Sequence, residues 1–143
     1  MPSPFRTRRR VEFADTDMAG IIHFANFFRF MEAAEVDFLQ SIGMSVTMRT
    51  DAGERFGFPR VAASCDFIKP VTFLDVLDIA VRVAKIGSKS VTYQFEFAKA
   101  GTVIARGQIT AVCCRFVPEQ PIESIPIPAA IRAKLEQHLG AAP

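Results

Sequence analysis

The sequence predicts an α+β fold in which an antiparallel sheet curls round one long helix. One amphipathic segment begins at residue 26, and its apolar residues recur at steps of three and four. Four segments between residues 60 and 116 either alternate apolar with polar residues or are mostly apolar, and short turns separate most of them. Short turns join antiparallel strands, and a helix with one apolar stripe must bury it on a sheet face.

The chain has 143 residues, half of them apolar, which predicts a single domain over residues 1–143 with a sizeable core. Fourteen phenylalanines suit a large helix–sheet contact or an apolar pocket. The net charge of +2 argues against general nucleic-acid binding. No stretch approaches the ~18 uninterrupted apolar residues of a membrane span, so none is expected.

The three cysteines, Cys65, Cys113 and Cys114, lie in apolar, strand-like segments. Neighbours in one strand face opposite ways, so Cys113 and Cys114 are poorly placed to pair. Free thiols in a reducing compartment are therefore expected. The N-terminus lacks the apolar core of a signal peptide, and a cytoplasmic protein is predicted. No CxxC or His/Cys cluster indicates a metal site.

The first strand is predicted over residues 5–13, where Val11 and Phe13 share one face. It carries a run of four arginines whose side chains point to both faces: Arg6, Arg8, Arg9 and Arg10. A solvated edge or a subunit contact accounts for this run, and phosphate binding is the alternative.

The helix is predicted from Asn26, its expected N-cap, to Gly43, its expected stop. Its apolar stripe consists of Phe27, Phe30, Met31, Ala34, Phe38 and Ile42. Two glutamates fall between or beside these positions. Glu35 is expected in solvent or in a salt bridge, whereas Glu32 is placed to line a pocket.

The remainder of the chain completes the sheet. Residues 44–59 are interpreted as an irregular connection because they mix glycine, proline and charge. Gly107 is expected at a bulge or a close approach. The strands are predicted over residues 60–68, 76–86, 90–98 and 102–116, followed by a short helix over 129–139 that begins at Pro128.

Function is predicted at the junction between the first strand and the helix, which holds Asp15, Asp17, Gly20 and His23. Free N–H groups at a helix start stabilise negative charge. A carboxylate that faces them can attack a carbonyl, or activate water against it. Asp17 is the predicted catalytic carboxylate, and the alternative is an aspartate that only stabilises its own turn. That structural role is assigned to Asp15.

The junction reads D15-T-D-M-A-G20-I-I-H-F-A-N-F28, and it is accompanied by S64-C-D-F-I-K-P70 and by D75-V-L-D78 with G87-S-K-S90. Over most of residues 5–116 the chain thus resembles the hotdog-fold acyl-CoA thioesterases of the 4-hydroxybenzoyl-CoA thioesterase type. The resemblance implies hydrolysis of an acyl-CoA thioester to a free acid and coenzyme A. It implies Asp17 as general base or nucleophile, the backbone N–H near Phe24 as oxyanion site, and Gly20 as the point of close backbone approach.

Further substrate contacts are expected from His23, Glu32 and the turn Ser88, Lys89 and Ser90, which suits the phosphates of coenzyme A. A solvated turn and a structural histidine are the alternatives. His23 stands where many relatives have an aromatic residue, so the role of their histidine does not transfer. The resemblance implies a homodimer or homotetramer with sites at the subunit boundaries, and no metal or cofactor beyond the coenzyme A of the substrate.

Two other functions remain open on sequence grounds. A hotdog dehydratase would act on a hydroxyacyl thioester through His23 and Asp17, and a non-catalytic module would only bind acyl thioesters. Neither releases free thiol. Ser64 has no GxSxG context, which excludes a serine hydrolase of that type. The acyl group, and its delivery by coenzyme A or by an acyl-carrier protein, are left open.

Overall fold

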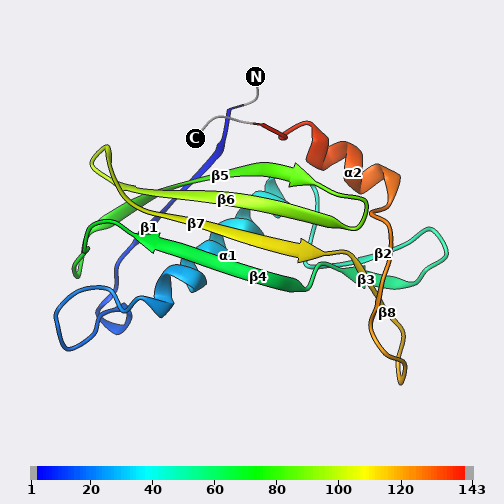
Figure 1. Cartoon of the computed structure of the whole chain (residues 1–143), viewed down its shortest axis with the longest axis horizontal. Coiled ribbons are helices and arrows are strands. Elements are labelled where there is room, and N and C mark those ends of the chain that lie inside the picture. Colours follow the sequence, from blue (N-terminus) through cyan, green and yellow to red (C-terminus); the bar gives the residue numbers. More distant parts are fainter. Residues whose placement is uncertain (1–2, 141–143) are drawn as a thin grey trace.

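The computed structural model describes residues 3–140 and has the α+β architecture that the sequence predicts (Figure 1). Five strands form an antiparallel sheet in the order β1–β5–β6–β7–β4, and the helix α1, Ala25–Ser41, lies across one face. The strands are Phe5–Arg10 (β1), Arg60–Phe67 (β4), Val76–Ile86 (β5), Ser90–Lys99 (β6) and Thr102–Val112 (β7). The predicted sheet wrapped round a long central helix, which is the hotdog arrangement, is confirmed.

The core lies between α1 and the inner face of this sheet. The alternation read from the sequence of β5 and β6 is confirmed, since every second residue is buried: Leu77, Ile79, Val81, Val83, Val91, Tyr93, Phe95 and Phe97. The helix contributes Phe27, Phe30, Met31, Ala34, Phe38 and Leu39 to the same cluster. Burial of each such large side chain contributes about 1.5–3 kcal/mol, so this contact dominates the stability of the fold.

Gly107 lies where the side chain of Met31, from α1, packs closely against the sheet. A Cβ atom at this position would lie 2.2 Å from the Sδ atom of Met31 and 3.2 Å from the carbonyl oxygen of Ser64. The prediction of a close approach at Gly107 is therefore confirmed, and the side chain of Met31 fills the space that the glycine leaves.

We expect Gly107→Ala to lower the free energy of unfolding by about 1–3 kcal/mol, because the added methyl group overpacks a buried contact. Met31→Ala alone should lower it by about 2–5 kcal/mol through a cavity. The double variant should lose less than the sum of the two, since each change relieves the other. Urea unfolding of the three variants measures this coupling, and strict additivity would contradict the packing described here.

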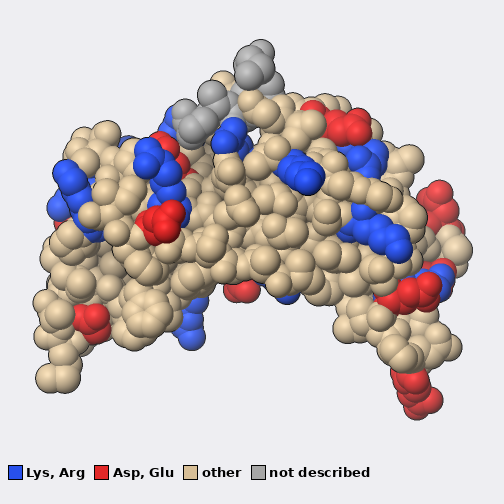
Figure 2. Space-filling model, viewed as in Figure 1, with Lys and Arg blue, Asp and Glu red and all other residues tan. Residues whose placement is uncertain are grey.

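The molecule has the shape of an arch (Figure 2). One projection is the segment between β1 and α1, and the other is a second, smaller sheet (Figure 1). Strand β4 runs along the hollow between them as an edge strand of the main sheet. Seven of its eight residues are exposed, and Cys65 is half-buried. A long edge with unpaired backbone groups is a template for pairing with another chain.

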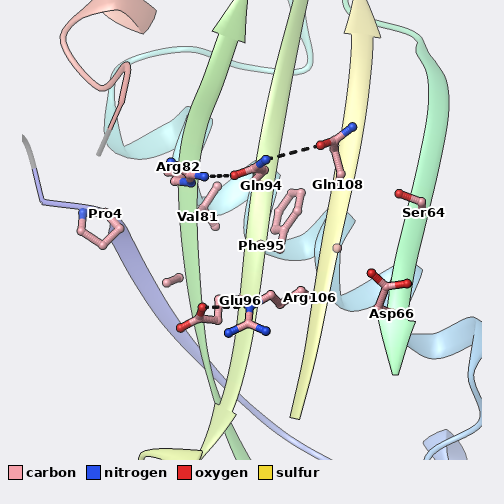
Figure 3. Close-up of a pocket in the computed structure, with 12 residues that line it drawn as sticks. Pro4, Ser64, Asp66, Val81, Arg82, Gln94, Phe95, Glu96, Arg106 and Gln108 are labelled. Atoms are coloured by element: carbon pink, nitrogen blue, oxygen red, sulfur yellow. Dashed lines mark hydrogen bonds and ion pairs between the residues drawn. The ribbon is translucent and has the colours of Figure 1, made fainter. Parts of the chain in front are cut away.

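The outer face of the main sheet carries rows of polar side chains (Figure 3). Arg82 donates to the side chain of Gln94, which in turn lies 3.5 Å from Gln108. Arg106 donates to Glu96 over 3.4 Å. These rows border a shallow depression of about 280 Å³, which none of the residues predicted to form the functional site lines.

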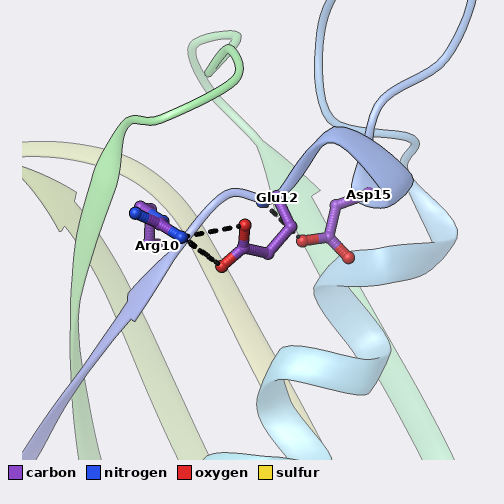
Figure 4. A network of polar contacts seen from close by, with 3 residues as sticks. All are labelled: Arg10, Glu12 and Asp15. Carbon is purple, nitrogen blue, oxygen red and sulfur yellow. Dashed lines mark hydrogen bonds and ion pairs between the residues drawn. The ribbon is translucent and has the colours of Figure 1, made fainter.

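Strand β1 ends at Arg10, three residues earlier than predicted (Figure 4). The N–H of Glu12 donates to Oδ2 of Asp15 over 2.8 Å, and Phe13–Asp15 form a 3₁₀ turn, η1. Asp15 thus stabilises its turn, as the sequence predicts. This side-chain bond competes with strand pairing, which is why the alternation of Val11 and Phe13 was misleading.

Two of the four arginines in β1 are paired with carboxylates of the same chain. Arg8 donates to Asp78 over 2.7 Å, and Arg10 donates to both carboxylate oxygens of Glu12. The guanidinium of Arg9 lies 4.6 Å above the ring of Phe30, on the opposite face of the strand. These contacts favour a structural role of the run over phosphate binding.

Two further element predictions are wrong. Residues 44–59 are not irregular, since Thr47–Arg49 (β2) and Arg55–Gly57 (β3) form a hairpin. The strand predicted over 102–116 is broken at Cys113, whose backbone N–H donates to the carbonyl of Lys89. The chain then enters the second sheet, of order β2–β3–β8–β9, as Cys114–Phe116 (β8), and Glu123–Ser124 (β9) closes that sheet.

The C-terminal helix α2, Ala129–Glu136, follows Pro128 as predicted and ends three residues before the predicted end at residue 139. All three cysteines are free thiols, with Cys113 and Cys114 buried. Neither helix within residues 3–140 has the length and apolar character that crossing a bilayer requires.

Candidate active site

Asp17 is the first residue of a tight turn that is held by hydrogen bonds of the Asp17 backbone. Its N–H donates to the carbonyl of Ile21 over 2.9 Å, and its carbonyl accepts from the N–H of Gly20 over 3.0 Å. One carboxylate oxygen, Oδ1, accepts from the N–H of Ala19 over 2.8 Å. Gly20 has a φ of +80°, so this glycine serves the turn geometry. The carboxylate is exposed, and its Oδ2 atom accepts no hydrogen bond within residues 3–140.

The start of α1 offers one free N–H group. The N–H groups of Asn26 and Phe27 donate to the carbonyls of His23 and Phe24. The N–H of Ala25 donates to Nδ1 of His23 over 3.1 Å. Only the N–H of Phe24 has no acceptor among the described residues. A free N–H at a helix start is suited to stabilise an oxyanion.

His23 therefore has a structural contact that the sequence did not reveal. The Nδ1 atom of its ring accepts this bond from the backbone N–H of Ala25. The ring stacks on Phe24 with centroids 4.8 Å apart. The predicted N-cap, Asn26, lies inside the helix, and its side chain instead donates to the carbonyl of Asp15 over 2.8 Å. The imidazole of His23, one residue before the N-cap Phe24, accepts the N–H of Ala25.

A groove of about 310 Å³ leads away from this helix start. The ring of Phe67, from the end of β4, lies 6.2 Å from that of Phe24 and 5.2 Å from that of Phe27. The lining is almost wholly apolar and consists of Ile21, Ile22, Phe24, Phe27, Phe67, Ile68, Lys69 and Pro70. Asp17 does not line it but is hydrogen-bonded to Ile21, which does. A thioester with an apolar acyl group fits such a groove.

The groove lies in an apolar surface that a single chain leaves uncovered. Phe24 is 59% exposed and Phe67 is 49% exposed. Other exposed large side chains of the same end of the molecule are Phe13, Met18, Ile68, Phe73 and Leu74. Neighbouring exposed apolar side chains of this kind are typical of interaction sites.

Glu35 is buried, with only 2% of its surface exposed. Arg60 holds both of its oxygens, with distances of 2.6 Å and 3.2 Å, so the predicted salt bridge is confirmed. Burial raises the pKa of Glu35, and the bond from Arg60 opposes that shift. Glu32 is mostly exposed and lies 3.8 Å from Arg60. It does not line the groove of its own chain.

The turn of Ser88, Lys89 and Ser90 lies at the far end of the sheet from Asp17. The segment that precedes β5 is bonded to the Asp17 loop, since the N–H of Ile22 donates to the carbonyl of Val71. The turn follows the last residue of β5, and a strand of 11 residues spans about 35 Å. Asp17, Gly20, His23 and Phe24 are therefore together in one chain, and the predicted phosphate-binding turn is not with them.

Sequence reasoning did not assign the groove wall formed by Phe67 to Pro70, although it singled out this segment as a motif. An aromatic residue followed by a proline at a strand end was the available signal. It also did not single out Arg60. Arg60 opens an edge strand, and nothing local in the sequence links it to Glu35.

Comparisons with known proteins agree with this fold. The model of the thioesterase-like superfamily matches residues 11–135. A 1,4-dihydroxy-2-naphthoyl-CoA hydrolase of Thermosynechococcus vestitus is 29% identical over 95% of this chain and 94% of its own. The structure of a gentisyl-coenzyme A thioesterase is 31% identical over 92% of this chain and 99% of that one, with a TM-score of 0.79. The structure of a 4-hydroxybenzoyl-CoA thioesterase, 18% identical over 94% of this chain and 99% of that one, shares the fold with a TM-score of 0.80. The chain therefore belongs to the thioesterase-like superfamily, in agreement with the hotdog thioesterase resemblance of its sequence.

Proposed function

We propose that the protein hydrolyses an acyl-CoA thioester to a free acid and coenzyme A. One observation carries this proposal beyond family membership. The apolar groove begins at Phe24, whose N–H is free, and the turn of Asp17 is bonded to the groove residue Ile21. A thioester carbonyl that accepts a hydrogen bond from that N–H would lie beside the turn that carries the Asp17 carboxylate.

Asp17 acts as general base or as nucleophile. As base, it takes a proton from water while the oxygen of that water attacks the thioester carbonyl. As nucleophile, it forms a mixed anhydride that water then cleaves. In both routes the carbonyl oxygen becomes negative beside the Phe24 N–H, and the thiolate of coenzyme A leaves when the carbonyl reforms. The contact with Ala19 occupies one oxygen of Asp17 and leaves Oδ2 for this work.

The acyl group is aromatic in this proposal. Three phenylalanine rings line the groove, and the ring of Phe67 packs against those of both Phe24 and Phe27. Aromatic pairs gain about 0.5–1.5 kcal/mol beyond simple burial, which favours a ring over an alkyl chain of equal area. The gentisyl-CoA and dihydroxynaphthoyl-CoA substrates named for the relatives belong to the same aromatic class.

A thiol-reactive dye assay with benzoyl, hydroxybenzoyl and alkyl coenzyme A thioesters tests both the thioesterase activity and its preference for an aromatic acyl group. Absence of thiol release from all of them would refute the proposal.

The active protein is a dimer that joins two β4 edges in antiparallel fashion. Such pairing is supported by the exposed edge strand and by the uncovered apolar surface beside the groove. It would place the Arg60 end of one β4 next to the Phe67 end of the other. The partner's turn of Ser88 to Ser90 would then approach the groove, and Glu32 of the partner would reach it from the same side. A homotetramer is two such dimers. The free cysteines suit the reducing cytoplasm.

Ala63→Lys is expected to convert the dimer to monomers and to lower thioesterase activity at least tenfold. Ala63 is exposed near the centre of β4, and a lysine there would meet its symmetry mate across the seam. Sedimentation and activity measured over a range of protein concentrations check this. Ala130→Lys, on an exposed position of α2, is the matched control and should change neither. A dimeric, active Ala63→Lys variant would place the subunit contact elsewhere.

A further inference from the structure

One face of the second sheet carries two arginines and an aromatic ring in a single row. Arg49 of β2 lies directly opposite Arg55 of β3, and Arg55 lies directly opposite Phe116 of β8. Residues directly opposite in antiparallel strands share one face of a sheet. The guanidinium of Arg55 lies 5.6 Å from the centroid of the Phe116 ring.

The charges in this row are not balanced by carboxylates. Among the described residues, Arg49 donates only to the carbonyl of Gly53, and no carboxylate lies within salt-bridge distance of Arg55. Arg115, by contrast, is held by Glu54 and Glu123. Like charges directly opposite each other destabilise a strand pair, so an anion bound between Arg49 and Arg55 would stabilise it.

The row also borders open space. Arg55 and Phe116 line two adjoining grooves of about 330 Å³ and about 550 Å³, and Arg49 lines the larger one. Guanidinium groups bind phosphate oxygens in bidentate fashion and stack on flat rings. A ligand that combines phosphates with a planar base matches this row of groups.

We propose that Arg49 and Arg55 bind the phosphorylated adenosine end of coenzyme A, and that they do so for the active site of the partner subunit. This inference rests on the proposed thioesterase function and on the proposed dimer. The second sheet adjoins the Arg60 end of β4, whereas the groove adjoins the Phe67 end. Antiparallel pairing of two β4 edges therefore brings the second sheet of one chain to the groove of the other. The pantetheine arm of the substrate bridges the two places.

The double variant Arg49→Gln and Arg55→Gln tests this. Loss of two charge-assisted contacts should raise KM for an acyl-CoA at least about tenfold with kcat unchanged. KM for the same acyl group on pantetheine, which lacks the adenosine phosphates, should not change. An unchanged KM for acyl-CoA, or an equal rise for both substrates, would overturn the assignment. Arg106→Gln, on the outer face of the main sheet, is the control and should alter neither.

Binding without turnover separates this inference from the proposed function. Adenosine 3′,5′-bisphosphate should bind the wild-type protein in a calorimetric titration, and the double variant should bind it at least about tenfold more weakly. Equal binding to both proteins would overturn the assignment. If the wild-type protein hydrolysed neither thioester, the proposed function would fail, and this titration would still decide the phosphate site.

Mixing of two differently impaired chains tests the partner contribution. When Asp17→Asn protein and the arginine double variant exchange subunits, half of the dimers are mixed, and each mixed dimer has one intact site if the site is shared. Activity at low substrate concentration should then recover to about a quarter of the wild-type value. If Arg49 and Arg55 served the Asp17 of their own chain, mixing would restore nothing, and the assignment to the partner would be wrong.

Discussion

Asp17→Asn is expected to lower kcat for thiol release from acyl-CoA by about 10²–10⁴-fold, the contribution typical of a positioned base. The amide can neither take a proton from water nor attack a carbonyl. It retains an oxygen that can accept from the Ala19 N–H, so the turn should persist. The loss should therefore appear in kcat, while KM, the oligomeric state and the free energy of unfolding stay near their wild-type values. Steady-state kinetics with a thiol-reactive dye and urea unfolding measure these quantities.

Asp15→Asn is the matched control for this experiment. The side-chain carboxylate of Asp15 accepts a hydrogen bond from the N–H of Glu12, and the backbone carbonyl of Asp15 accepts one from the N–H of His23. Its replacement weakens a charge-assisted bond and should affect stability, with kcat close to that of the wild-type protein. Near-normal hydrolysis by Asp17→Asn would remove Asp17 from the mechanism, and equal losses in both variants would indicate that the whole turn acts through structure.

Long periodic segments made the fold predictable. The helix and strands β5 and β6 each repeat their apolar pattern over ten or more residues, and all three were predicted with small errors at their ends. The hairpin of β2 and β3 was missed because three residues are too few to show a period of two. The break at Cys113 was missed because the strand remains apolar through it, and only the bond to the distant Lys89 marks it.

The site was predictable as far as it is contiguous in sequence. The sequence of residues 15–24 predicts a carboxylate beside a helix start, and the structure brings these residues together. His23 accepts the N–H of Ala25, so among the described residues Phe24 alone keeps a free N–H at this helix start, and no sequence pattern specifies this. The wall formed by Phe67 depends on β4 being the edge strand next to β7, and that order comes from the whole sheet. For the same reason, the sequence did not show that the turn at Ser88 lies at the end of the main sheet opposite to Asp17.

Arg60→Ala is expected to lower the free energy of unfolding by about 3–5 kcal/mol at neutral pH, because it leaves a buried carboxylate without its partner. Glu35 is only 2% exposed, and both of its oxygens are bound by Arg60. Urea unfolding at one protein concentration measures the loss. Arg106→Ala, which breaks the exposed pair with Glu96, should change stability by no more than about 1 kcal/mol and serves as control.

The pH dependence identifies the cause of that loss. Burial already raises the pKa of Glu35 in the folded protein, and removal of Arg60 removes the group that opposes the rise. The folded state of the variant then binds a proton at pH values where the unfolded state, with a carboxyl pKa of about 4.3, does not. Stability must consequently fall as the pH rises through the folded pKa, and it is highest at acid pH.

Arg60→Ala should therefore regain part of its lost stability when the pH is lowered from 8 to 5. Arg60→Met combined with Glu35→Met should be stable at both, since two apolar side chains need no proton. A loss that is the same at pH 5 and pH 8 would mean that Arg60 stabilises the fold through packing of its stem and not through the charge of Glu35.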